Sequence, residues 1–195
     1  MGISDWTTRE ACSRQDQVLQ AAARCFVEEG FHGASMSRIA KAAKMSPGHI
    51  YHYFESKEEI IKAIVQRDEE GACDFLERFR SYGPDELADQ LVGCVIDGVK
   101  GNTDAFHSLL TLEILAEAAR NPSVREIVAD VDRKFRRGMA DMLEDRLGLE
   151  DALMRVEAVS ALFSGLTIRA IRNPDLDLER LTSQIQKALR ALLEP

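Results

Sequence analysis

The stretch GASMSRIAKAAKMSPGHIYHYFESKEEI, residues 33–60, decides the fold of this 195-residue chain. It holds two short apolar repeats of helical period, and each follows a serine that can cap a helix, Ser35 or Ser46. Pro47 occupies the first helical position after Ser46, where its missing N–H costs no hydrogen bond. Two short helices joined by a tight turn are therefore expected, and this is the arrangement of a helix-turn-helix.

The second of these helices carries polar rings in a chain with few aromatic residues. At about 100° per residue, Pro47, Ile50 and Phe54 fall on its inward side, with Tyr51 at the edge. The alternative is that these rings only cover an apolar surface. We disfavour it, because the outward side chains are polar and basic residues flank them. We therefore predict a DNA-binding surface. Its outward residues are Ser37, Arg38, Lys41 and Lys44, followed by Gly48, His49, His52 and Tyr53.

The net charge of −8 does not exclude a nucleic-acid partner, because the charge is distributed unevenly. Residues 1–57 hold seven Lys and Arg against six Asp and Glu, whereas the other 138 residues hold 18 against 27. Local charge decides whether a surface attracts phosphate, so a near-neutral head can still present one basic face.

Helical periodicity continues through the rest of the chain, and no strand alternation competes with it. A helix before the quoted stretch is expected to stop at Gly30, and a long helix to start at Ser56, where Glu59 completes a capping box. The predicted fold class is all-α: an N-terminal three-helix helix-turn-helix domain, then a helical bundle, about nine helices altogether. The later helices are expected near residues 84–100, 103–120, 122–147, 150–171 and 177–193, with breaks at Gly101-Asn102, Asn121-Pro122, Gly148 and Asn173-Pro174.

Three motifs, in register, carry a family resemblance: F-x-E-x-G at 26–30, I-A-x-A-A at 39–43 and Y-H-Y-F-x-S-K-E at 51–58. Residues 14–60 closely resemble the DNA-binding domain of TetR-family transcriptional regulators. The resemblance implies that the rings lie on the recognition helix and that Tyr51 and Lys57 contact phosphate. The DNA-binding residues are then Ser35, Ser37, Arg38, Lys44, Gly48, His49, Tyr51, His52, Tyr53 and Lys57.

Two departures from the family pattern bear on this surface. Lys44-Met45 stands where Gly-Val is usual, so a positive φ at Lys44 would cost about 1 kcal/mol while adding a positive charge near the DNA backbone. His49 replaces a common small hydroxyl residue and is expected to alter the base preference.

The second part of the chain resembles the family in layout. LEILAEAARNPSVREIV, residues 112–128, resembles the C-terminal domain of the branch that contains betaine- and glucuronide-responsive repressors. This resemblance implies a small-molecule pocket in the middle helices and a two-fold interface formed by the last two. Residues 1–55 are accordingly expected to form a tail and the DNA-binding domain, and residues 56–195 a ligand-binding and dimerisation domain.

The predicted pocket centres on the segment 105–119, which is apolar nearly all round and therefore expected to be buried. His107 or Glu113 could orient a ligand in an apolar cavity. Alternatively, His107 is a structural residue, Glu113 pairs with an arginine such as Arg169, and the Phe and Met residues are plain core. The predicted pocket residues are Phe75, Phe79, Phe106, His107, Leu110, Glu113, Phe135, Met139 and Phe163.

The helix expected at 150–171 has apolar residues on more than one face, and the helix at 177–193 carries a matching apolar stripe. This pattern favours a homodimer over packing within a single subunit. Small residues such as Ser160 and Gly165 would let two backbones approach closely. The predicted dimer-interface residues are Val156, Val159, Ser160, Phe163, Leu166, Leu181, Ile185 and Leu189.

Other classes of protein are disfavoured. The chain contains no HExxH, GxSxG, GxxxxGK[ST] or GxGxxG motif, so no enzyme activity, catalytic residue or cofactor is predicted. His49 and His52 lack a third ligand, so no metal site is predicted. The four cysteines, Cys12, Cys25, Cys73 and Cys94, lack paired spacing and indicate reduced thiols.

The sequence therefore predicts a cytoplasmic, ligand-responsive transcriptional regulator, a repressor by the family default. It would bind a palindromic double-stranded operator as a homodimer and leave it when a small-molecule inducer binds. No signal peptide and no run of about 18 apolar residues is found, so no membrane partner is expected. The competing hypothesis is a helical protein-interaction adaptor that does not bind DNA.

Overall fold

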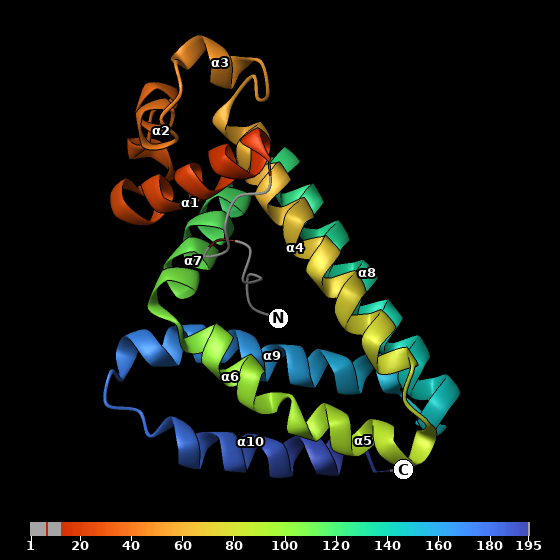
Figure 1. The fold of residues 1–195 in the computed structure, drawn as a ribbon. Helices are drawn as coiled ribbons and strands as arrows, with labels where there is room; N and C mark the ends of the chain where they lie inside the picture. The colour runs from red at the N-terminus through yellow and green to blue at the C-terminus, as the bar shows by residue number, and fades with distance from the viewer. Residues whose placement is uncertain (1–6, 8–12, 195) are drawn as a thin grey trace. The chain divides into compact units, whose positions relative to one another are not determined.

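A computed structural model of the chain describes Thr7 and residues 13–194. The described residues form α-helices joined by short turns, without a strand among them, so the all-α prediction is confirmed (Figure 1). Cys12 and the rest of the predicted N-terminal tail, Thr7 excepted, lie outside the described residues. The helices are α1 Arg14–Gly33, α2 Met36–Ala42, α3 Pro47–Tyr51, α4 Lys57–Arg80, α5 Pro84–Gly93, α6 Val95–Thr103, α7 Ala105–Arg120, α8 Pro122–Leu147, α9 Ala152–Arg172 and α10 Leu178–Leu192.

The chain divides into two compact units. The head unit comprises the described residues of 3–69 together with residues 109–131, and the body unit comprises residues 70–108 and 132–194. Helices α4, α7 and α8 each contribute residues to both units. The division of function at residues 55 and 56 that the sequence suggests stays a prediction.

In the head unit, α1 packs on α2 and α2 packs on α3 (Figure 1). Their contacts are made by fully buried side chains such as Val18, Phe26, Ile39 and Ile50. The regular part of α1 ends at Gly30, as predicted, because Gly30 adopts φ 74° and ψ 160° and leaves one more turn before Ala34. A glycine is suited to this positive φ.

Helix α4 begins one residue after Ser56, whose hydroxyl accepts a hydrogen bond from the Glu59 amide at 3.2 Å. The Glu59 carboxylate in turn accepts a hydrogen bond from the Glu55 amide at 2.7 Å. The predicted capping box is therefore present in its first half, and its second half is shifted by one residue.

Two predictions for the body unit are wrong. The single helix expected over residues 84–100 is divided into α5 and α6, because Cys94 has ψ −5° and acts as the cap of both. The break expected at Gly101-Asn102 does not occur, since both residues lie within α6. The Asn102 side chain donates to the Gly98 carbonyl at 2.8 Å, which keeps this polar residue inside the helix, and α6 ends at Thr103 with Asp104 as its C-cap.

The other predicted breaks occur where expected. Helix α8 starts at Pro122, directly after Asn121, and α9 ends before Asn173. Gly148 adopts a φ of 63° after the last turn of α8. The loop residue Asp151, also at a positive φ, precedes α9.

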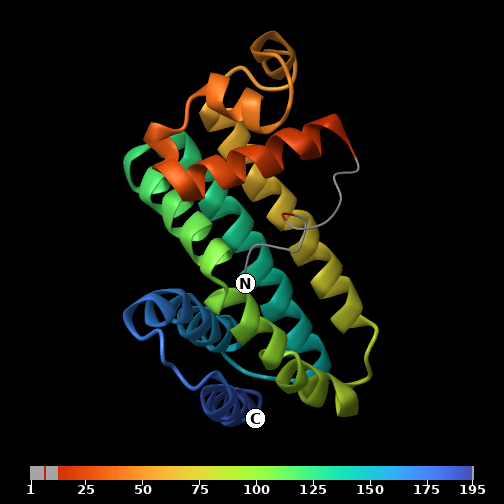
Figure 2. The ribbon, with the colours of Figure 1, turned by 60° about the vertical axis from the view of Figure 1, so that its left-hand side comes forward.

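In the body unit, α6 packs against both α9 and α10, and α5 packs against α10 (Figure 2). A cluster of buried side chains that includes Phe79, Leu87, Leu143, Val156 and Ile185 forms the core. Cys25, Cys73 and Cys94 are free thiols, as predicted. Among the described residues, no helix is both long and apolar enough to span a bilayer.

Helix α7 is less buried than its composition suggests. Leu109 and Leu115 are 44% and 48% exposed, so the expectation that this helix is surrounded on all sides is wrong for one face. Its buried face carries Leu110, Ile114 and Ala118, and it also carries a buried carboxylate, Glu117.

Candidate functional site

The turn between α2 and α3 has a defined geometry. The Met45 amide donates to the Ala40 carbonyl at 2.9 Å and the Lys44 amide donates to the Lys41 carbonyl at 3.1 Å, which together form a Schellman motif. Lys44 has φ 56°, so the strain considered for a positive φ at this residue applies. A non-glycine residue there costs about 1 kcal/mol, which the rest of the head must offset.

The short helix α3 is stabilised by a cap at its start and by buried side chains beneath it. Ser46 caps it by accepting a hydrogen bond from the His49 amide at 3.3 Å, and Ile50 and Phe54 are buried beneath it. Pro47, which the helical wheel places on the inward side, is instead exposed, because the first turn of so short a helix lies beyond the core. A Cβ at Gly48 would meet no atom within 4 Å, so the fold itself leaves open space above this residue.

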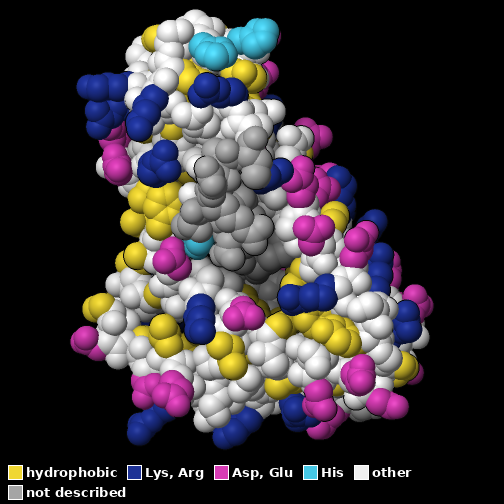
Figure 3. All heavy atoms as spheres, viewed as in Figure 1, with side chains coloured by type: hydrophobic (Ala, Val, Ile, Leu, Met, Phe, Trp, Pro, Cys, Tyr) yellow, Lys and Arg dark blue, Asp and Glu magenta, His cyan; other side chains and the backbone are white. Residues whose placement is uncertain are grey.

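The polar rings of α3 and the turn that follows it form an exposed group. Tyr51 is 53% exposed, and His49 and His52 are exposed as well. The ring of Tyr53, half-buried, lies 5.5 Å from that of His49 and 5.4 Å from that of His52. Figure 3 shows the imidazoles over α3 with Lys and Arg side chains on the neighbouring α2.

The positive charges beside these rings are not equally available. Lys41 and Lys44 are exposed, and no ion pair involves either of them among the described residues. Arg38 is held at 2.6 Å by the Glu29 carboxylate of α1. Ser37 is exposed, whereas the Ser35 hydroxyl accepts a hydrogen bond from the Arg38 amide and caps α2, as predicted.

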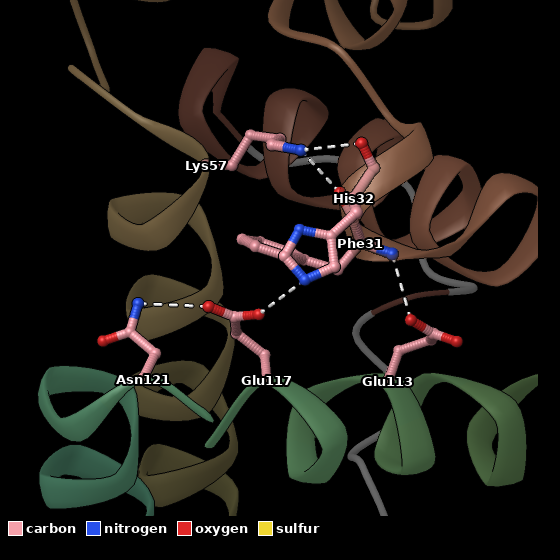
Figure 4. A network of polar contacts seen from close by, with 6 residues as sticks. All are labelled: Phe31, His32, Lys57, Glu113, Glu117 and Asn121. Atoms are coloured by element: carbon pink, nitrogen blue, oxygen red, sulfur yellow. Dashed lines mark hydrogen bonds and ion pairs between the residues drawn. The ribbon is translucent and has the colours of Figure 1, made fainter. Parts of the chain in front are cut away.

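The family resemblance predicts that Lys57, the first residue of α4, contacts phosphate. In the structure its ammonium group reaches the end of α1 (Figure 4). Its ammonium donates to the Phe31 carbonyl at 2.6 Å and reaches the His32 carbonyl at 3.4 Å. The same group lies 4.7 Å from the centre of the Phe31 ring. In this geometry Lys57 satisfies the carbonyl groups that the break at Gly30 leaves at the end of α1.

Two carboxylates of α7 hold the other side of the same turn (Figure 4). The Phe31 amide donates to Glu113 at 3.0 Å, and the Glu113 carboxylate lies 3.6 Å from where a Cβ of Gly30 would be. Glu117, 5% exposed, lies 3.4 Å from the His32 imidazole and accepts a hydrogen bond from Asn121 at 3.1 Å. Sequence reasoning missed this network, because residues 31 and 113 are 82 positions apart.

The body unit contains a cavity of about 310 Å³. The structure brings four of the nine predicted pocket residues to its wall: Phe75, Phe135, Met139 and Phe163. It also places there residues that the sequence analysis did not select. Among them are Arg78, Cys94, Asp97, Gly98, Asn102 and Arg155. Arg78 could have been found, because it lies one helical turn after Phe75.

The other five predicted pocket residues lie elsewhere. Phe79 is buried in the core of the body unit, and Phe106 is half-buried on α7. His107 is buried, with its Nδ1 3.2 Å from Asp104. The remaining two belong to the head unit: Leu110, which is buried, and Glu113, which holds the Phe31 amide.

The predicted dimer residues face the body unit itself. Val156, Leu166, Ile185 and Leu189 are each less than a tenth exposed, and Val156, Val159, Ser160, Phe163 and Leu189 line the cavity. Leu181 is half-buried against the same core. The opposite face of α9 is open: Met154, Leu162, Ile168 and Ile171 are 42–63% exposed.

Comparison with protein families gives two matches. Residues 18–64 match the model described as "Bacterial regulatory proteins, tetR family", and residues 83–195 match "Tetracyclin repressor-like, C-terminal domain". The HTH-type transcriptional regulator UidR of Escherichia coli K12 is 37% identical over 138 residues, which are 70% of this chain and 67% of UidR. The HTH-type transcriptional repressor AcnR of Corynebacterium glutamicum is 41% identical over 56 residues, 29% of each chain.

Solved structures have the same fold. Salmonella enterica GusR superposes with a TM-score of 0.73 at 31% identity, over 95% of this chain and 97% of GusR. FadR of Bacillus subtilis, solved in complex with stearoyl-CoA, superposes with a TM-score of 0.70 over 89% of this chain and 96% of FadR. At 20% identity, this second likeness concerns the fold alone.

The hydrogen bond from Phe31 to Glu113 is expected to stabilise the head unit. Glu113→Ala should lower its free energy of unfolding by about 1.5–3 kcal/mol, since the amide loses a charged acceptor. Glu113→Gln keeps an acceptor and should lose less. Hydrogen exchange of the amides around residue 31 in the full chain measures the difference. Equal protection in the parent and in Glu113→Ala would contradict this role.

The charge of Lys57 should contribute to the stability of the head unit, and the charge of Lys41 should not. Lys57→Met keeps the apolar stem but removes the ammonium from the Phe31 carbonyl, so it should lower the stability of the head unit by about 1–3 kcal/mol. Lys41→Met, the matched control on the exposed face of α2, should leave stability unchanged. Urea denaturation of both variants provides the comparison, and an unchanged midpoint for Lys57→Met contradicts the capping role.

Proposed function

We propose that this chain, which belongs to the TetR family of bacterial transcriptional regulators, represses transcription as a homodimer on a palindromic operator and is released by a small-molecule ligand. It is a DNA-binding regulator, as its relatives are named. The observation that carries the finer proposal is the group of three exposed rings, His49, Tyr51 and His52, beside the half-buried Tyr53 on a helix-turn-helix whose turn also presents Lys44.

The proposed reading of DNA divides these residues by chemistry. The imidazoles of His49 and His52 can donate to or accept from base edges in the major groove. The Tyr51 hydroxyl and the charges of Lys41 and Lys44 suit phosphate oxygens, which fix the orientation of the helix on the duplex. The open space above Gly48 supports a close approach of the DNA backbone at the start of α3.

The remaining predicted contacts have other partners in the free chain. The Ser35 hydroxyl and Arg38 already have partners within the head unit. In the proposed complex each would contact DNA while it keeps its partner in the head unit. The Lys57 ammonium already donates to carbonyls of α1, so it would contact phosphate only through an N–H group that does not bind them. We keep all three in the proposed surface, with Ser37, as secondary contacts.

The proposed dimer uses the open face of α9 in place of the residues selected from the sequence. Four of those residues are buried by their own subunit, so they have little surface left to offer a partner. The open face combines Met154, Leu162 and Ile168 with the exposed Ala158 and Ala161, and such small residues let two helices approach closely. A two-fold pairing there would present two heads to half-sites about 34 Å apart.

The proposed ligand site is the cavity of the body unit. Its walls are predominantly apolar with a few polar groups, as in most small-molecule sites. Helix α4 supports a coupling role, because it carries Phe75 and Arg78 at the cavity and Lys57 in the head unit. A ligand can only favour the DNA-free state by differential affinity, and a hundredfold release requires about 3 kcal/mol.

DNA binding is tested with a palindromic operator taken from the promoter region of the regulated genes, in gel-shift titrations at several salt concentrations. The affinity should fall linearly on a log–log plot against salt. Tyr51→Phe should weaken binding to all operator variants about tenfold, whereas His49→Ala should relax preference at one base pair worth about 1–3 kcal/mol. An adaptor that does not bind DNA would give no specific shift, and that result overturns the proposal.

The dimer is tested with two isoleucines of equal exposure. Ile168 on α9 and Ile96 on α6 are 46% and 45% exposed, but only Ile168 lies in the proposed interface. Ile168→Glu should therefore give a monomer in light scattering after size exclusion, because a buried unpaired charge is costly at an interface. Ile96→Glu should remain a dimer. If both variants keep the same mass as the parent, the open face of α9 is not the interface.

A further inference from the structure

Three phenylalanines line the cavity of the body unit. Phe75 of α4 and Phe135 of α8 have ring centres 6.1 Å apart, and Phe163 of α9 also lines the cavity. Gly98 of α6 lies so close to Phe163 that a Cβ would stand 2.5 Å from its ring. The absence of a side chain at residue 98 therefore allows the ring to lie where it does.

Three polar side chains of the cavity lining are already bound to the protein. The Asn102 amide donates to the Gly98 carbonyl at 2.8 Å. Arg155 donates to the carbonyls of Glu150 at 3.0 Å and Leu192 at 2.8 Å, and so ties the end of α10 to α9. The Cys94 thiol donates to the Leu91 carbonyl at 3.1 Å.

Arg78 differs from these groups. Its guanidinium lies over two aromatic rings, 4.8 Å from the centre of Phe79 and 5.4 Å from that of Phe75. Among the described residues no carboxylate forms an ion pair with it, and no hydrogen bond uses its N–H groups. Stacking fixes the plane of a guanidinium while leaving its edge free to bind a carboxylate with two parallel hydrogen bonds.

The electrostatics of the wall favour a negative ligand. Asp97 also lines the cavity, and it is exposed. Burial raises the pKa of the Cys94 thiol to about 11, so the thiol is neutral near pH 7 and adds no negative charge. The charge of Arg78 lowers the pKa of this thiol and that of Asp97 raises it, so both charges act at the cavity wall.

We propose that the cavity binds an amphipathic organic carboxylate, whose carboxylate group pairs with Arg78 and whose apolar, preferably aromatic, body lies among Phe75, Phe135 and Phe163. This inference rests on the proposed function of the cavity as the effector site and specifies its chemistry. A volume of about 310 Å³, at the low end for small-molecule sites, suits a compact acid with a single ring.

Calorimetric titration of the full chain with 4-phenylbutyrate and with its neutral isostere 4-phenylbutanamide tests the proposal. The acid should bind at least tenfold more tightly than the amide. Arg78→Gln should remove this preference by weakening only the acid, and Arg78→Lys, which keeps the charge but loses the planar fork, should retain part of it. Because Arg78 is exposed, both variants are expected to fold, and a thermal melt verifies this.

Gly98→Ala is the matched control, since it must displace the Phe163 ring and should change the affinities for acid and amide alike. Equal affinities of acid and amide, a preference that survives in Arg78→Gln, or no binding of the acid would each overturn the proposal. These titrations contain no DNA. An acid that binds through Arg78 but leaves the operator complex intact would therefore contradict the effector role while the ligand assignment stands.

Discussion

The head unit depends on how the break at Gly30 is stabilised. A helix that stops abruptly leaves backbone donors and acceptors without partners, and burying such groups is costly. Here the Phe31 amide binds the Glu113 carboxylate and the Phe31 carbonyl binds the Lys57 ammonium. Two charged side chains from α7 and α4 thus replace the missing helical bonds. The last turn of α1 is therefore fixed on α4 and α7, as well as on α2.

The basic side chains fall into two groups: those that bind other groups of the protein and stabilise the fold, and those without such a partner among the described residues. Lys57 and Arg155 bind backbone carbonyls, and Arg38 pairs with Glu29. Lys41 and Lys44 are exposed beside the rings of α3, and Arg78 stacks on aromatic rings at the cavity. Counting basic residues along the sequence cannot make this distinction, because a charge bound to a carbonyl contributes less to recognition than one that faces solvent.

Local chemistry explains what the sequence could predict. Ser35, Ser46 and Gly30 act within a few residues of themselves, so the caps and the end of the first helix could be inferred from their neighbours. The cost of a positive φ at Lys44 could be stated in advance from its place in the motif, but the structure supplies the φ itself. By contrast, Glu113 and Lys57 find their partners through tertiary packing. An apolar stripe does not reveal which protein surface covers it. Val156 and Leu166, predicted at the interface, are buried within their own subunit.

Among the described helices, α4, α7 and α8 contribute residues to both units and so connect the cavity to the head along the chain. For α7 a hydrogen-bonded connection exists within the body unit: Gly98 and Asn102 line the cavity, and the Ser108 hydroxyl donates to the Asn102 carbonyl at 3.1 Å. Five residues further on, the same helix presents Glu113 to the last turn of α1. One helix, α7, thus carries both the hydroxyl bound to the cavity-lining Asn102 and the carboxylate bound to the Phe31 amide. Differential strain between the ligand-free and ligand-bound states is the form of energy that an allosteric coupling requires.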